Sequence, residues 1–140
     1  MCGAMTRILG CLLYKYDIIG FLHWGFNHYF SILSKELINP YEKNDYNNFP
    51  TGDSFIVYPY KEGVAFSLRA QLFFDALQDL RALSLLGKLI GKENTVKIIE
   101  DTAGMEIEFD KFPHNEAFIL NLRENINKKI NFAIKTLKNK

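Results

Sequence analysis

The sequence predicts an α/β fold in which two strands of a parallel sheet are followed by a helical extension. Three observations predict it. Residues 18–24 (IIGFLHW) form a nearly continuous β-branched and aromatic run, which is typical of a strand buried on both faces. Residues 54–58 (SFIVY) form a second such run, and a long amphipathic pattern begins after Ser67.

The first half of the chain is predicted to hold one helix, two strands and a long loop. Apolar residues spaced by three and four predict a helix over 6–16 that Asp17 ends. The stretch 25–53, rich in Asn, Tyr, Phe and Gly, is predicted to be a loop with one helical turn near 31–37. Loops of this length inside compact domains are often functional.

The second half is predicted to be mainly helical. Ser67 is a suitable N-cap for an amphipathic helix that continues to Ile90 and ends at Gly91. A shorter helix is predicted over 93–102, stopped by Gly104, and Asn115 is predicted to cap a last helix through about Leu137. Alternation over 105–112 fits either an edge strand or an extended connector.

Composition excludes several classes of protein. The 140 residues are 48% hydrophobic, which rules out disorder, and 17 basic against 16 acidic side chains leave a net charge of +1. This balance predicts no nucleic-acid and no membrane partner. Only two cysteines and no convincing signal peptide favour a cytoplasmic protein.

Charge is nevertheless unevenly distributed near the end of the chain. Residues 100–118 carry six acids and one lysine, whereas residues 121–140 carry six basic residues and one glutamate. A solvated helix face beside an acidic loop is the favoured interpretation, and a nucleic-acid-binding tail is the alternative.

Polar and aromatic side chains gather where the two predicted strands end. His23, Trp24 and Asn27 follow the first strand, and Tyr58 ends the second. Ligands bind at the carboxyl ends of strands in parallel α/β folds, and aromatic faces with polar edges suit a carbohydrate. Core packing of Trp24 and Tyr58 is the alternative. The spacing of His23 and His28 does not favour a metal site, and no cofactor-binding motif is present.

Several ordered motifs resemble the carboxyl-terminal catalytic region of glycoside hydrolase family 123, also catalogued as domain of unknown function 4091. The resemblance covers the chain from about Arg7 to the last helix. Its motifs are GFLHWGFN (20–27), NPYE (39–42), PTGDSFIVYP (50–59), SLR (67–69) and ALQDL (76–80).

The resemblance implies a (β/α)8 barrel that acts on terminal β-linked N-acetylgalactosamine by substrate-assisted catalysis. An Asp positions the acetamido group of the substrate, and the adjacent Glu is the general acid. This sequence contains no Asp-Glu step, so no catalytic residue is predicted. By position, His23, Trp24, Asn27 and Tyr58 would bind the sugar.

Two further residues are assigned supporting roles. Asp53 would lie at the opposite end of the second strand, and Arg69 would brace a loop or form a structural ion pair. Residues 60–62 (YKE) depart from the family pattern, in which a glycine commonly follows the Tyr-Pro pair.

Together these observations predict the carboxyl-terminal fragment of a (β/α)8 barrel, with about two parallel strands and a helical extension. Residues 1–140 would form a single partial domain, in which 7–90 hold the late barrel elements and 91–140 the extension. The missing amino-terminal part of the same protein would be its partner. A stand-alone carbohydrate-binding or protein-interaction module is the alternative function, and a structural remnant without ligand is a third.

Overall fold

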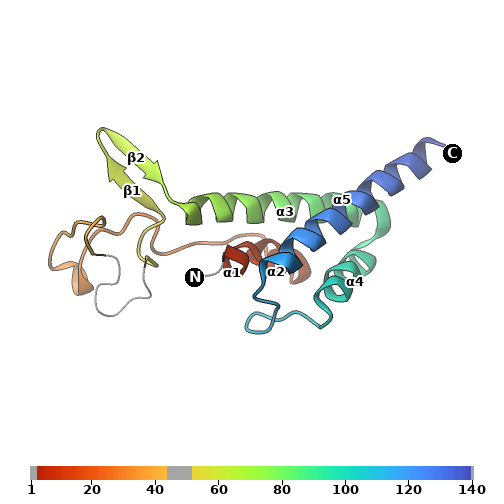
Figure 1. The fold of residues 1–140 in the computed structure, drawn as a ribbon, viewed down its shortest axis with the longest axis horizontal. Coiled ribbons are helices and arrows are strands. Elements are labelled where there is room, and N and C mark those ends of the chain that lie inside the picture. The colour runs from red at the N-terminus through yellow and green to blue at the C-terminus, as the bar shows by residue number, and fades with distance from the viewer. Residues whose placement is uncertain (1–2, 44–51, 140) are drawn as a thin grey trace. The chain divides into compact units, whose positions relative to one another are not determined.

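A computed structural model describes residues 3–43 and 52–139, apart from the side chain of residue 32 (Figure 1). The chain forms two compact units. The first contains residues 1–20 and 72–140, and the second contains residues 21–71. The predicted 25–53 loop lies in the second unit, and its residues 44–51 lie outside the described residues.

The first unit is helical. It contains α1 (Gly3–Arg7), α2 (Leu9–Lys15), most of α3 (Leu68–Ile90), α4 (Lys92–Ala103) and α5 (Glu116–Lys138). The predicted 6–16 helix is therefore two short helices that meet at Ile8, and Asp17 follows α2 with a left-handed φ of 54°. Helix α2 lies against α3 at Gly10, where a Cβ would come within 2.1 Å of the Ala76 carbonyl oxygen.

The predicted caps and stops of the later helices are confirmed. The Ser67 hydroxyl accepts a hydrogen bond from the Ala70 amide at 3.2 Å, and the Asn115 side chain accepts one from the Phe118 amide at 2.8 Å. Gly91 and Gly104 end α3 and α4 with φ values of 90° and 68°, which favour glycine. Residues 105–112 form a connector with one isolated bridge, between Glu108 and Lys111, rather than an edge strand.

Apolar side chains of all five helices and of the connector form one core. It contains Ala4, Ile8, Cys11, Leu12, Ala82, Leu83, Leu86, Ile99, Ile107, Phe118, Ile119, Leu122 and Ile126. Because nearly half of these belong to α4, α5 and the connector, the helical extension supplies a large part of the core.

A buried carboxylate joins three helices of this unit. Asp79 on α3 is only 5% exposed and accepts two hydrogen bonds from Arg7 on α1, at 2.6 and 3.1 Å. Arg123 on α5 donates to the same carboxylate at 2.9 Å and to the Gln78 carbonyl oxygen at 3.1 Å. The hydrogen bond to Asp79 raises the pKa of Arg7. Paired in this way, the charge of Asp79 is stabilised despite its burial.

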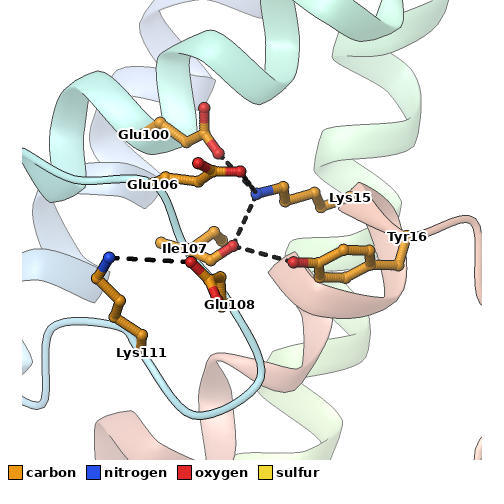
Figure 2. A network of polar contacts seen from close by, with 7 residues as sticks. All are labelled: Lys15, Tyr16, Glu100, Glu106, Ile107, Glu108 and Lys111. Atoms are coloured by element: carbon orange, nitrogen blue, oxygen red, sulfur yellow. Dashed lines mark hydrogen bonds and ion pairs between the residues drawn. The ribbon is translucent and has the colours of Figure 1, made fainter.

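A second polar network joins α2, α4 and the connector (Figure 2). The Lys15 ammonium donates to Glu100 at 2.8 Å, to Glu106 at 3.3 Å and to the Ile107 carbonyl oxygen at 2.7 Å. The Tyr16 hydroxyl donates to the same carbonyl oxygen at 3.2 Å. The hydrogen bond to Glu100 is the main cause of the raised pKa of Lys15.

The second unit contains a β-hairpin rather than a parallel sheet. Strand β1 (Val57–Tyr60) pairs antiparallel with β2 (Gly63–Phe66), and Val57 lies opposite Phe66. A 3-10 turn, η1 (Ile32–Ser34), lies within the region where one helical turn is predicted.

The two predicted parallel strands are therefore wrong for the residues that the structure describes. Residues 18–24 form no strand, and Ile19 and Leu22 on this segment are 105% and 90% exposed. The segment after residue 24 pairs antiparallel with residues 54–56 instead, and β1 pairs with β2 across a two-residue turn at Lys61 and Glu62. The coarser prediction, a chain that combines helices with strands, holds.

The ion pairs of Asp79 with Arg7 and Arg123, here called the Asp79 clamp, predict a large loss of stability when the carboxylate is removed. Asp79→Asn should lower the free energy of unfolding by about 3 kcal/mol, because it leaves two guanidinium groups without their carboxylate. The control is Asp101→Asn, which removes an exposed pair with Lys97 and should cost about 0.5 kcal/mol. Urea unfolding monitored by circular dichroism measures both, and equal small losses would contradict the clamp.

The Lys15 network predicts a stability term that is lost at alkaline pH. The pKa of Lys15 is raised in the folded state, so its contribution is fully present below the unfolded pKa and disappears as pH rises through the folded value. Lys15→Met should lower Tm at neutral pH and differ less from the unmodified chain only above about pH 10.5, the ordinary lysine pKa. Melting curves between pH 7 and 11 test this, with the exposed Lys97→Met as control. A pH-independent difference would be the contrary result.

Candidate carbohydrate site

The second unit places three of the predicted site residues together. The indole N–H of Trp24 donates to Asp53 Oδ2 at 3.0 Å, and His23 Nε2 lies 3.8 Å from the other carboxylate oxygen of Asp53. The Asp53 carboxylate thus holds both rings at the start of the segment that leads into β1.

Backbone pairing creates this juxtaposition. Asn27 forms an antiparallel bridge with Phe55, the His28 amide donates to the Ser54 carbonyl oxygen at 3.0 Å, and the Ile56 amide donates to that of Phe26 at 2.8 Å. Residues that follow Trp24 therefore run antiparallel to residues that follow Asp53.

This direction corrects the predicted position of Asp53. Two parallel strands would bring Trp24 toward Tyr58, because their carboxyl ends coincide, and would leave Asp53 at the far end. In the antiparallel arrangement, the end of the first segment meets the beginning of the second. Asp53 therefore contacts Trp24, whereas none of the contacts described for Tyr58 joins it to Trp24 or Asp53.

Gly25 makes the close approach possible. A Cβ at this position would lie 2.4 Å from the Asp53 carbonyl oxygen and 2.6 Å from the Ser54 Cα, both of which belong to the backbone and cannot rotate away. The glycine between Trp24 and Phe26 is therefore required by the geometry of the site.

His23 is held by contacts to both ring nitrogens. The Gly25 amide donates to Nδ1 at 3.2 Å, so Nδ1 is the acceptor, and the hydrogen-bond pattern assigns the ring proton to Nε2, which faces Asp53. Nδ1 is therefore occupied by the backbone, whereas the 3.8 Å between Nε2 and Asp53 is too long for a direct hydrogen bond.

Trp24 presents an accessible aromatic surface. Its side chain is 50% exposed even though the indole nitrogen is bound, and its ring lies 5.7 Å from that of His28. His28 in turn lies 5.8 Å from Phe30. Half-exposure favours a surface role over core packing for Trp24. Asn27 is also exposed.

Tyr58 belongs to a separate aromatic cluster around β1. Its ring lies 5.3 Å from Tyr41 and 5.1 Å from Phe55. The hydroxyls of Tyr29 and Tyr41 donate to the carbonyl oxygens of Val57 and Pro59 at 2.7 and 2.6 Å, and burial raises the pKa of Tyr29. Sequence reasoning did not assign Tyr29 or Tyr41. The available signals were the NPYE motif (39–42), which contains Tyr41, and the tyrosine content of the 25–53 stretch.

Arg69 braces the turn that carries Asp53. Its guanidinium donates to the Phe55 carbonyl oxygen at 2.7 Å and lies over the Phe55 ring. A Cβ at Gly52 would lie only 1.9 Å from the Arg69 Nη1 atom, so the glycine, which has a φ of 75°, leaves room for the guanidinium. These contacts support the predicted bracing role.

The described residues offer neither a metal centre nor a membrane span. No group of three or more His, Cys, Asp or Glu side chains that could hold a metal ion occurs among residues 3–43 and 52–139. Within the same ranges, no helix is both long and apolar enough to cross a bilayer.

The folded segments match a class of carbohydrate-active domains. The model for "Glycoside hydrolase 123, catalytic domain" matches residues 3–86, which include both site segments and most of α3. The chain therefore belongs to glycoside hydrolase family 123, as the resemblance implied. No curated protein matches the chain. Helices α4 and α5 lie beyond the matched residues.

The close approach at Gly25 predicts a selective disruption of the site. Gly25→Ala should separate the two segments and release the indole of Trp24 from Asp53, because the added Cβ meets backbone atoms. Trp24 is the only tryptophan, so its fluorescence reports on this site alone, and a shift to longer wavelength is expected. Gly20→Ala is the control, since nothing lies within 4 Å of its Cβ position. Unchanged emission in Gly25→Ala would contradict the proposed geometry.

Proposed function

We propose that this chain forms the aromatic carbohydrate-binding wall of a family 123 catalytic domain. A glycoside hydrolase domain implies a carbohydrate substrate. The observation that carries the finer proposal is the half-exposed indole of Trp24, oriented by Asp53 beside His23. A fixed, accessible aromatic face is what stacking on the C–H surface of a sugar requires.

The proposed ligand is a terminal β-linked N-acetylgalactosamine, the substrate that the family implies. His23, Trp24, Asn27 and Tyr58 are the proposed binding residues, with Asp53 and Arg69 in supporting roles. The hydrogen bond from Trp24 to Asp53 favours a role for Asp53 in orienting the indole, although the parallel arrangement had placed it at the far end of the strand. The same hydrogen bond favours Trp24 over Tyr58 as the main stacking surface.

In this proposal the chain binds the sugar and does not catalyse its hydrolysis. Substrate-assisted hydrolysis needs a general acid next to a carboxylate that positions the acetamido group, and the sequence has no Asp-Glu step. The catalytic pair would be contributed by an amino-terminal part of the same protein. The exposed apolar side chains of Ile19 and Leu22 support a further part of the protein that covers this segment.

The binding proposal predicts a specific loss in Trp24→Ala. In the longer protein that also carries the amino-terminal part, titration with N-acetylgalactosamine, followed by NMR, should show affinity reduced about fivefold to tenfold, which corresponds to the loss of one stacking contact. The melting temperature should change little, because the ring is half exposed. Tyr60→Ala, an exposed aromatic on the hairpin, is the control and should leave binding intact. Unchanged affinity with a lowered melting temperature would make Trp24 a core residue.

An activity assay separates the proposed function from its alternative. Mixed with an aryl β-N-acetylgalactosaminide, the chain should give no turnover above the uncatalysed rate, and clear turnover would contradict its proposed catalytic incompleteness. Saturable sugar binding by a monomeric, cooperatively folded chain would favour the stand-alone module instead.

A further inference from the structure

The second half of α5 differs from the first half in burial. Phe118, Ile119, Leu122 and Ile126 are buried in the core of the first unit, whereas no described side chain after Ile126 is buried. Figure 1 shows the blue end of α5 continuing beyond α3 and α4 of the same unit. Residues 127–138, here called the α5 tail, form about three helical turns that are mostly exposed, with Ile130 still packed against the core.

The α5 tail carries cations without acidic partners. It contains four lysines and no acid. Lys128 pairs with Glu124, but Lys129, Lys135 and Lys138 form no ion pair with any described residue. Elsewhere in the first unit, Lys15, Lys92, Lys97 and Lys111 are each paired with a carboxylate, and Lys88 is the described lysine for which no ion pair is found. The helix dipole accounts for cations in the last turn, but not for Lys129.

Exposed apolar side chains accompany these lysines. Phe132 is 70% exposed. Three lysines lie on the same helix face, because they are three or four residues from Phe132 along α5: Lys128, Lys129 and Lys135. Leu137 is 59% exposed in the following turn. The tail therefore combines an exposed aromatic ring, a second apolar side chain and unpaired positive charge.

We propose that the α5 tail binds the surface of an anionic phospholipid bilayer. Lysines would contact the headgroups while Phe132 enters the interface, a combination that suits a basic helix lying on a membrane. The tail fits a single-stranded nucleic acid less well. Such a ligand stacks its bases on several successive aromatic side chains, and an exposed aliphatic side chain such as Leu137 does not contribute to that stacking. The net charge of +1 for the whole chain does not oppose this, because screening restricts the interaction to nearby charges.

The test is co-sedimentation of the full chain with two kinds of vesicle at low salt. One contains phosphatidylcholine alone, and the other contains phosphatidylcholine with about one third phosphatidylserine. We expect binding to the anionic vesicles only. The Lys129→Gln, Lys135→Gln, Lys138→Gln triple variant should bind about a hundredfold more weakly, at about fivefold for each lysine. Phe132→Ser should bind severalfold more weakly, and its circular dichroism should be unchanged.

Matched controls make the outcome decisive. The Lys35→Gln, Lys43→Gln, Lys61→Gln variant removes the same charge from exposed positions in the second unit and should bind as the unmodified chain does. An equal loss in both triple variants would overturn the proposal, as would equal binding to neutral vesicles. Binding of a single-stranded oligonucleotide that depends on the same three lysines, without vesicle binding, would assign the tail to nucleic acid and also overturn it.

Discussion

A single buried carboxylate determines how the helical unit is held together. Asp79 accepts hydrogen bonds from Arg7 and Arg123, so helices from the beginning, middle and end of the chain share one anion. A charge buried to this extent is stable only with such partners, and each guanidinium is in turn fixed by the carboxylate. The apolar core also holds these helices together, but apolar contacts are non-directional and do not fix how each helix is rotated. The ion pairs specify which side of α3 faces α1 and which residue of α5 lies beside it.

This clamp also bears on the boundary of the family match. Arg7 and Asp79 lie within the matched residues 3–86, whereas Arg123 lies outside them. Core residues of α4 and α5 pack in the same cluster as those of α1, α2 and α3. The extension is therefore part of the same folded unit as the first and last segments of the family region, residues 3–20 and 72–86.

In the second unit, the direction of backbone pairing decides which side chains meet. Because residues 26–28 pair antiparallel with residues 54–56, Trp24 meets Asp53, and Gly25 permits the contact. The same aromatic residues in a parallel arrangement would have gathered Trp24 with Tyr58. One change in direction thus decides which polar group orients the indole, and it separates the tyrosine cluster around β1 from the Trp24 side.

Local chemistry allowed much of the fold to be predicted from the sequence. Ser67, Gly91, Gly104 and Asn115 begin or end helices through their own side chains or their backbone preferences, so those boundaries were predictable. The family was predictable as well, because ordered motifs carry it. Strand pairing was not: residues 18–24 are apolar enough for a buried strand, yet a strand forms only where a partner supplies its hydrogen bonds. Nor could the sequence indicate that Asp79 binds Arg7 and Arg123, 72 and 44 residues away, or that Asp53 binds Trp24. The sequence alone determined the helices, their caps and the family, because these depend on neighbouring residues, whereas pairing direction, the buried clamp and the orientation of Trp24 were decided only by the tertiary structure, which brings distant groups together.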